Sequence, residues 1–139
     1  MEFIYEHVTI AQRSDVTDGD TIVFTIDLGF KVAVRETFRI LELDTYETTR
    51  RIRHGIKCTV AEAKKGKEAK KFAQDLLMGK RLKLVVEGKT GKYGRWLAHL
   101  WVEQTRAPDN VEIATEGEHY WLNYAEWMRF EYDRDKNPI

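Results

Sequence analysis

The sequence predicts an α+β domain that is mainly β, in which five strands form a small closed barrel. Three observations predict this fold. Three strand-like segments precede a helical pattern, two more strand-like segments follow it, and a short second helical pattern lies near the C-terminus. By length, residues 1–139 form a single domain, large enough to bury a core without disulfides or metals.

The first three strands are predicted to form an antiparallel meander. Residues 3–11 mix β-branched and aromatic side chains, and apolar residues alternate with polar ones over residues 21–26. Between them lies an Asp-Gly dipeptide, Asp18-Gly19, which is typical of a hairpin turn. Residues 27–30 turn the chain again, and residues 31–43 return as a long third strand.

The first helix is predicted to begin after Thr59. The segment Thr59-Val60-Ala61-Glu62 fits a capping box, in which the threonine hydroxyl and the glutamate each meet a free backbone N–H. Gly79 is a natural C-terminal stop. Apolar residues recur at helical spacing and form a stripe that faces the core: Ala69, Phe72, Ala73, Leu76 and Leu77.

The remaining elements complete the barrel. Residues 82–86 alternate as the fourth strand, a glycine-rich turn follows, and Arg95 opens the fifth strand. Residues 104–117 are polar and predict a loop, residues 120–130 predict a short helix, and the charged end at 131–139 is expected to fray. Five strands with a helix between the third and fourth fit an OB-fold barrel. All four tryptophans are expected in the core, and His99 on a strand face.

Composition excludes several classes of protein. No run approaches the roughly 18 apolar residues of a membrane span, so no membrane partner is expected. The lone Cys58 excludes an internal disulfide and a zinc site of ordinary spacing. No signal peptide is visible, which favours a cytoplasmic or phage-encoded protein unless a signal was removed. We expect a monomer.

Positive charge is concentrated in the middle of the chain. Lysine plus arginine balances aspartate plus glutamate at 23 each, yet residues 50–95 contain fifteen basic residues and four acidic ones. Such a segment can attract a polyanion. A solvated, lysine-rich helix face is the commoner explanation.

Residues 38–48 combine a strand with an acidic turn. Alternation places Arg39 on one face with two leucines, where a guanidinium is costly unless an anionic group meets it. Asp44, Thr45 and Glu47 follow with hard oxygen ligands and a candidate general base. The stretch suggests a site for phosphate chemistry, and a salt-bridged strand end is the alternative.

A second acidic motif, Asp18-Gly19-Asp20-Thr21, precedes the second strand. In a meander barrel the end of the third strand can lie beside the start of the second, which would bring Asp20 and Asp44 together. Two close carboxylates repel unless a cation lies between them, and Ca²⁺ would accept both. Taken alone, Asp20 has an alternative reading as a turn aspartate.

In this order, the motifs resemble the staphylococcal nuclease (thermonuclease) family. The residues that carry the resemblance are Asp18-Gly19-Asp20-Thr21, Arg39 with residues 44–48, and Lys92-Tyr93-Gly94-Arg95. Residues 27–30 look like a turn of the phage and prokaryotic branch. The resemblance covers roughly residues 16–102 and weakens after that.

The resemblance implies a calcium-dependent nuclease acting on DNA and RNA. It implies that Asp20 and Asp44 bind Ca²⁺ through their carboxylates, and Thr45 through its backbone carbonyl. The family breaks the bond from phosphorus to the 5′ oxygen.

The resemblance also implies the catalytic and substrate-binding residues. Glu47 would be the general base for the attacking water, and Arg39 and Arg95 would hold the phosphate. Lys92 and Tyr93 match positions that contact the nucleotide's terminal phosphate and base.

Two departures from the family pattern affect these expectations. Tyr46 stands where the family usually has proline, so we expect either a looser approach to Glu47 or a ring that stacks on a nucleobase. After Val102 the family's third helix is missing and its late tyrosines have no secure counterpart, so the resemblance does not extend to substrate binding on that side.

Two other classes of function remain open, a non-catalytic nucleic-acid-binding module and a protein-interaction barrel of the same fold. The non-catalytic module is disfavoured because every candidate catalytic and metal-binding residue is present in the sequence. The second is disfavoured because the sequence shows no obvious exposed apolar run.

Overall fold

A computed structural model describes residues 3–46, 48, 52–53, 56–57, 59–89, 94–104, 113–116 and 119–136. The elements are β1 (Phe3–Thr9), the 3₁₀ helix η1 (Arg13–Asp15), β2 (Val16–Asp18), β3 (Thr21–Gly29), β4 (Val32–Ile40), β5 (Ile52–Arg53), β6 (Ile56–Lys57), α1 (Val60–Leu77), β7 (Leu82–Lys89), β8 (Trp96–Gln104), β9 (Ile113–Glu116), β10 (His119–Asn123) and α2 (Tyr124–Tyr132).

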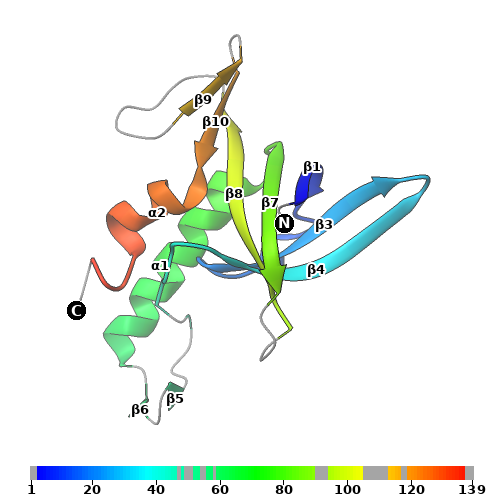
Figure 1. The fold of residues 1–139 in the computed structure, drawn as a ribbon. Helices are drawn as coiled ribbons and strands as arrows, with labels where there is room; N and C mark the ends of the chain where they lie inside the picture. The colour runs from blue at the N-terminus through cyan, green and yellow to red at the C-terminus, as the bar shows by residue number, and fades with distance from the viewer. Residues whose placement is uncertain are drawn as a thin grey trace.

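Five of the strands form a closed barrel (Figure 1). β1 pairs antiparallel with β3 and β7, β3 pairs with β4, and β7 pairs with β8. The ring closes where β4 runs parallel to β8, with Arg39 opposite Leu97. Helix α1 follows β4 and precedes β7 in the chain. The predicted five-stranded OB-fold barrel is therefore confirmed, and its single parallel pair makes the barrel mixed.

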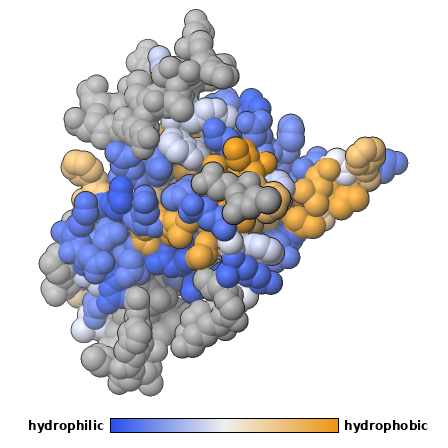
Figure 2. All heavy atoms as spheres, viewed as in Figure 1, coloured by the Kyte–Doolittle hydropathy of each residue, from blue (hydrophilic) through white to orange (hydrophobic). Residues whose placement is uncertain are grey.

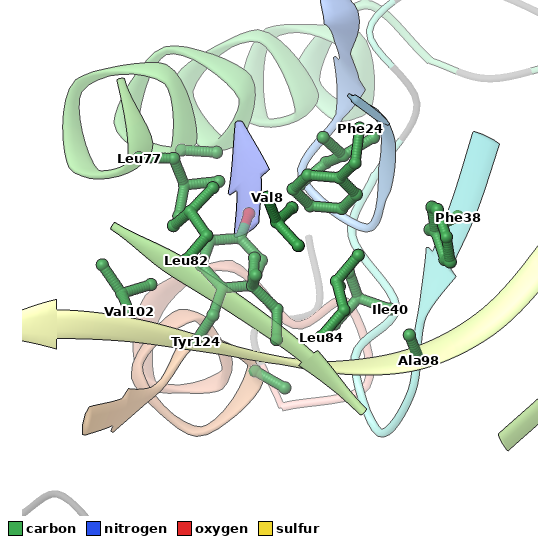
Figure 3. Close-up of a cluster of buried hydrophobic side chains, with 14 of the residues drawn as sticks. Val8, Phe24, Phe38, Ile40, Leu77, Leu82, Leu84, Ala98, Val102 and Tyr124 are labelled. Atoms are coloured by element: carbon green, nitrogen blue, oxygen red, sulfur yellow. The ribbon is translucent and has the colours of Figure 1, made fainter. Parts of the chain in front are cut away.

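The core consists of inward side chains of the five barrel strands together with side chains of α1 and α2, such as Leu77 and Tyr124 (Figure 3). On β8, for example, Ala98, Leu100 and Val102 are buried while the alternate residues are not. This period of two is the alternation that the sequence shows. Of the four tryptophans, Trp96 and Trp127 pack against the core as expected.

The other two tryptophans, Trp101 and Trp121, were expected in the core and instead lie on the outer face of the sheet. The Lys83 ammonium lies 5.7 Å from the Trp101 ring centroid and 4.6 Å from that of Trp121. Trp101 alternates with the buried residues of β8 and therefore points outward. His99 lies on the same face of β8 as Trp101, and its Nε2 is 2.9 Å from Glu87 Oε2. The prediction that His99 lies on a strand face is therefore confirmed.

Helix α1 begins and ends as predicted. The Thr59 hydroxyl accepts a hydrogen bond from the Glu62 N–H at 3.1 Å, and the Glu62 carboxylate accepts one from the Thr59 N–H at 3.0 Å. The helix ends at Leu77, and Gly79 adopts a φ of +74° that favours glycine. Ala69, Ala73 and Leu77 are buried along the predicted stripe.

The C-terminal part of the sheet differs from expectation. β9 and β10 form a hairpin that extends the sheet beside β8, in a region predicted as loop and helix. Helix α2 begins at Tyr124, because the Asn123 side chain caps it by accepting a hydrogen bond from the Glu126 N–H at 3.1 Å. The third barrel strand also ends early, at Ile40, because Glu42 adopts a φ of +64° in a turn.

The distal half of the β3–β4 hairpin projects from the barrel as an arm with an apolar tip (Figures 1 and 2). Phe30 is fully exposed there, and Leu28 and Val32 are about half exposed. Gly29 and Lys31 separate these three residues, so the sequence contains no continuous apolar run here, and the structure nevertheless exposes all three on one tip. None of the described helices is long and apolar enough to cross a membrane.

The ion pair between Asp15 and Arg35 ties η1 to β4 and predicts a dependence of stability on pH. Both carboxylate oxygens of Asp15 accept hydrogen bonds at 2.6 Å from the guanidinium. These bonds hold the pKa of Asp15 below its ordinary value of 3.8. A lowered folded-state pKa contributes stability that is fully present above 3.8 and is lost as pH falls through the folded value.

Replacing Asp15 by asparagine should therefore lower the free energy of unfolding at pH 7. The difference from wild type should shrink as the pH falls below 3.8. Urea unfolding across this pH range measures both effects, with the exposed Asp75→Asn as control. A difference that is the same at every pH would contradict the prediction.

Candidate functional site

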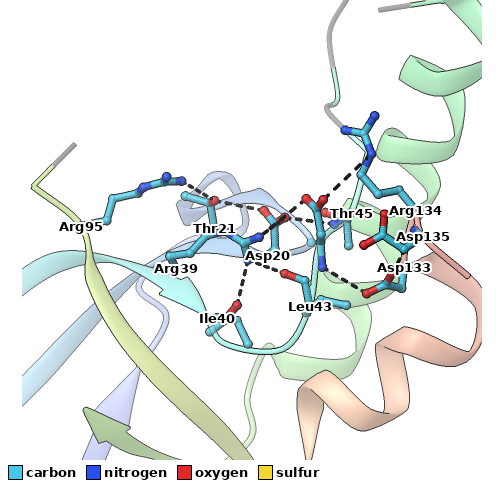
Figure 4. Close-up of polar contacts among 12 residues, drawn as sticks. Asp20, Thr21, Arg39, Ile40, Leu43, Thr45, Arg95, Asp133, Arg134 and Asp135 are labelled. Atoms are coloured by element: carbon cyan, nitrogen blue, oxygen red, sulfur yellow. Dashed lines mark hydrogen bonds and ion pairs between the residues drawn. The ribbon is translucent and has the colours of Figure 1, made fainter. Parts of the chain in front are cut away.

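Asp20 lies at the start of β3, beside the end of β4 (Figure 4). Its backbone carbonyl accepts a hydrogen bond from the Ile40 N–H at 2.8 Å, which extends the β3–β4 pairing to this point. Its carboxylate accepts one from the Thr45 N–H at 2.9 Å and one from the Thr21 hydroxyl at 3.1 Å. The carboxylate is buried and faces the loop that follows β4, which we call the site loop (residues 41–46).

Arg39 connects the two predicted carboxylates. Its Nη2 lies 3.4 Å from Asp20 Oδ2 and 3.6 Å from Asp44 Oδ1. Its Nη1 donates hydrogen bonds to the backbone carbonyls of Ile40 and Leu43. The guanidinium is thus held by two hydrogen bonds and two ion pairs, and Asp20 and Asp44 lie on the same side of the barrel as predicted.

The surroundings of Asp20 raise the pKa of its carboxyl group. Burial raises the pKa of Asp20 above its ordinary value, and the carboxylates of Asp18 and Asp44 add to the increase. The Arg39 guanidinium and the Thr45 N–H oppose it. The net increase means that the folded protein holds this negative charge at a cost, which a bound cation would reduce.

Arg95 reaches the same site from the start of β8. Its Nη1 donates a hydrogen bond to the Thr21 hydroxyl at 3.3 Å, and that hydroxyl donates in turn to Asp20. Gly94 precedes it with a φ of +65°, a backbone conformation that favours glycine. Thr21 therefore links Arg95 to Asp20.

A second segment supports the site loop from the C-terminal end. Residues 133–136, which we call the C-terminal turn, were expected to fray, and the structure shows instead that Asp133 and Arg134 pair with the loop. Thr45 and Asp133 form an isolated antiparallel bridge. The Arg134 N–H donates to the Asp44 carbonyl at 2.8 Å, and the Asp44 N–H donates to Asp133 Oδ2 at 3.3 Å.

Tyr46 is buried, with 4% of its surface exposed. The guanidinium carbon of Arg134 lies 4.9 Å from the centroid of its ring. The ring therefore packs inside the protein and is not placed to stack on a nucleobase, which corrects one of the two expectations for this position.

Gly19 is required by the close approach of the site loop. A Cβ at this position would lie 2.7 Å from Thr45 Cγ2, closer than carbon atoms tolerate. The hydroxyl of the buried Tyr124 donates a hydrogen bond to the Gly19 carbonyl, so α2 fixes the same turn from the other side.

Of the predicted site residues, the structure brings five together and leaves three untested. The five are Asp20, Arg39, Asp44, Thr45 and Arg95, joined by the contacts given above. Glu47, Lys92 and Tyr93 lie outside the described residues.

The described residues fit part of a calcium site. Ca²⁺ takes roughly six to eight oxygen ligands, and the carboxylates of Asp20 and Asp44 are of this kind. The Thr45 hydroxyl is buried and has no hydrogen-bond partner among the described residues, so this hard oxygen is not taken up by another hydrogen bond there. Within the described ranges, no three acidic, histidine or cysteine side chains cluster as a metal site. A complete coordination shell therefore needs further oxygens, from elsewhere in the chain or from water.

The model of the family described as "Staphylococcal nuclease homologue" matches residues 37–123, more than half of the chain. The chain belongs to this family. The matched segment of this staphylococcal nuclease homologue includes Arg39, Asp44, Thr45 and Arg95, and it begins after Asp20. Proteins of the family are typically nucleases that use Ca²⁺, and the domain implies a nucleic-acid substrate. A comparison with curated proteins found no match.

Proposed function

We propose that this staphylococcal nuclease homologue is a calcium-dependent nuclease of the phage and prokaryotic branch, which hydrolyses phosphodiester bonds of DNA and RNA as a single-domain monomer. One observation supports the proposal above all others. Arg39 lies between Asp20 and Asp44, and Arg95 reaches the same network through Thr21. Acidic groups for a cation and guanidiniums for a phosphate are thus combined at one place.

In the proposed site, Asp20 and Asp44 hold Ca²⁺ through their carboxylates, and Thr45 holds it through its backbone carbonyl. Calcium, when bound, supplies positive charge that offsets the charge of the phosphodiester and makes water a better nucleophile. The bridge to Asp133 and the hydrogen bond to Asp20 fix Thr45 before any cation binds.

Arg39 and Arg95 bind the phosphate and stabilise the charge that grows on its equatorial oxygens. A guanidinium suits this role because its planar fork holds two oxygens and stays charged at working pH. Glu47 takes a proton from the water that attacks phosphorus in line. The new bond joins the water oxygen to phosphorus, and the bond from phosphorus to the 5′ oxygen breaks. The 5′ oxygen takes up a proton from solvent and leaves as a 5′-hydroxyl, and the phosphate remains on the 3′ oxygen. Lys92 and Tyr93 contact the nucleotide's terminal phosphate and base.

A cleavage assay tests the proposed function. We expect single-stranded DNA and RNA to be cleaved in Ca²⁺ and to remain intact in EGTA. Glu47→Gln should lower the rate constant about a hundredfold or more, because the amide cannot accept the proton of the attacking water. Glu42→Gln is the matched control, since Glu42 is a site-loop carboxylate that faces Arg129 at 4.0 Å.

The other outcomes of this assay identify the alternatives. Nucleic-acid binding without cleavage in Ca²⁺ would replace the enzyme by a non-catalytic binding module. If the protein neither binds nor cleaves nucleic acid, the remaining alternative is a protein-interaction barrel.

A further inference from the structure

One side chain of the C-terminal turn, that of Arg134, contacts both the site loop and helix α1. Arg134 extends from the C-terminal turn, and its Nε lies 4.0 Å from Asp44 Oδ2. Its Nη2 lies 3.6 Å from Glu62 Oε2, at the first turn of α1. Its guanidinium also covers the Tyr46 ring. Only 22% of its side-chain surface is exposed, so these contacts are largely shielded from water.

We propose that Arg134 is a positioning residue that holds the site loop in the geometry needed for cation binding. Asp44 contributes the second carboxylate of the site, and the backbone on both sides of its Cα is already paired with the C-terminal turn. Arg134 adds contacts to the Asp44 carboxylate and to the next aromatic ring in the loop. A metal ligand held by such neighbours binds with less loss of conformational freedom.

Two features distinguish this role from that of an ordinary surface arginine. The partners of Arg134 come from residues 44, 46 and 62, so its removal takes away the contacts that this side chain makes between the loop and α1, while the backbone pairing of the loop with the C-terminal turn remains. The Thr45 N–H, which donates to Asp20, lies between Asp44 and Tyr46. Loosening of the loop should therefore be detectable at this one amide.

The experiment compares Arg134→Ala and Arg134→Lys with a matched control, Arg81→Ala. Arg81 also combines an ion pair, with Glu103 at 3.4 Å, and an aromatic partner, Trp121 at 5.8 Å, but it lies outside the site. Hydrogen exchange at the Thr45 amide is measured by NMR without calcium, and Ca²⁺ affinity is measured by calorimetry. Urea unfolding reports whether each variant remains folded.

We expect Arg134→Ala to lower the protection of the Thr45 amide and the affinity for Ca²⁺ each by about tenfold or more, with β8 amides unchanged. Arg134→Lys keeps the charge but loses the planar contact with Tyr46, so it should have a smaller effect in the same direction. Arg81→Ala should change neither quantity. If Arg134→Ala does not fold, the lysine variant decides the question by the same measurements.

The inference rests on the proposed function, and different measurements test the positioning role of Arg134 and the nuclease function. Unchanged Thr45 protection in a folded Arg134 variant overturns the positioning role, whatever the nuclease assay shows. Lost protection with unchanged Ca²⁺ affinity overturns the link to cation binding. A wild-type protein that binds no Ca²⁺ refutes the proposed function, and the inference for cation binding with it, while exchange at Thr45 still reports whether Arg134 holds the loop.

Discussion

Replacing Arg39 by lysine is expected to reduce the rate constant for phosphodiester cleavage about a hundredfold or more, which corresponds to roughly 3 kcal/mol of transition-state stabilisation. Arg39 makes two hydrogen bonds to the carbonyls of Ile40 and Leu43 while facing both carboxylates of the site. A lysine ammonium is a single point charge and cannot keep this orientation while binding a phosphate. Steady-state cleavage of a short single-stranded DNA at saturating Ca²⁺ gives kcat for both proteins.

Arg35→Lys is the control for this variant. Arg35 lies on the same strand and pairs with Asp15, away from the site. It should leave kcat unchanged. Wild-type kcat in Arg39→Lys would mean that Arg39 only organises the loop and does not stabilise the reacting phosphate.

Replacing Asp20 by asparagine is expected to weaken the binding of Ca²⁺ without lowering the free energy of unfolding in the absence of calcium. Ca²⁺ affinity should fall about a hundredfold or more, since a charged ligand becomes a neutral one. Without calcium, stability at pH 7 should be unchanged or higher, because burial raises the pKa of Asp20 and an amide avoids the cost of a buried charge. An asparagine oxygen can still accept the hydrogen bond from the Thr45 N–H.

Calorimetry with Ca²⁺ and urea unfolding in EGTA measure the two effects of this variant. Asp75→Asn is the control, since Asp75 is an exposed carboxylate that pairs with Arg13 at 2.9 Å. A folded Asp20→Asn protein that binds Ca²⁺ normally would remove Asp20 from the proposed site. A large loss of stability in EGTA would show that the carboxylate serves mainly to hold Thr21, Arg39 and Thr45.

The barrel could be predicted from the sequence because its strands follow simple local rules. Alternation in β7 and β8 marks the buried side of each strand, and the capping box at Thr59 marks the start of α1. The meeting of Asp20 and Asp44 could also be predicted, because antiparallel pairing places the start of β3 beside the end of β4.

The parts that could not be predicted depend on contacts between distant segments. Nothing in the charged stretch after Tyr132 indicates that Asp133 pairs with Thr45, because a single bridge has no periodic pattern. The hairpin of β9 and β10 is short and lies in a polar region, so its pairing with β8 has no strong local signal. Trp101 and Trp121 show that large aromatic residues can lie outside when lysine covers them.

The bridge between Thr45 and Asp133 has a consequence for the order in which the protein is made. Synthesis proceeds from the N-terminus, so β1 to β8 emerge from the ribosome before the C-terminal turn does. A nascent chain can thus close its barrel while the loop that carries Asp44 still lacks its last pairing partner. The catalytic competence we propose would therefore arise only after residues 133–136 have emerged from the ribosome.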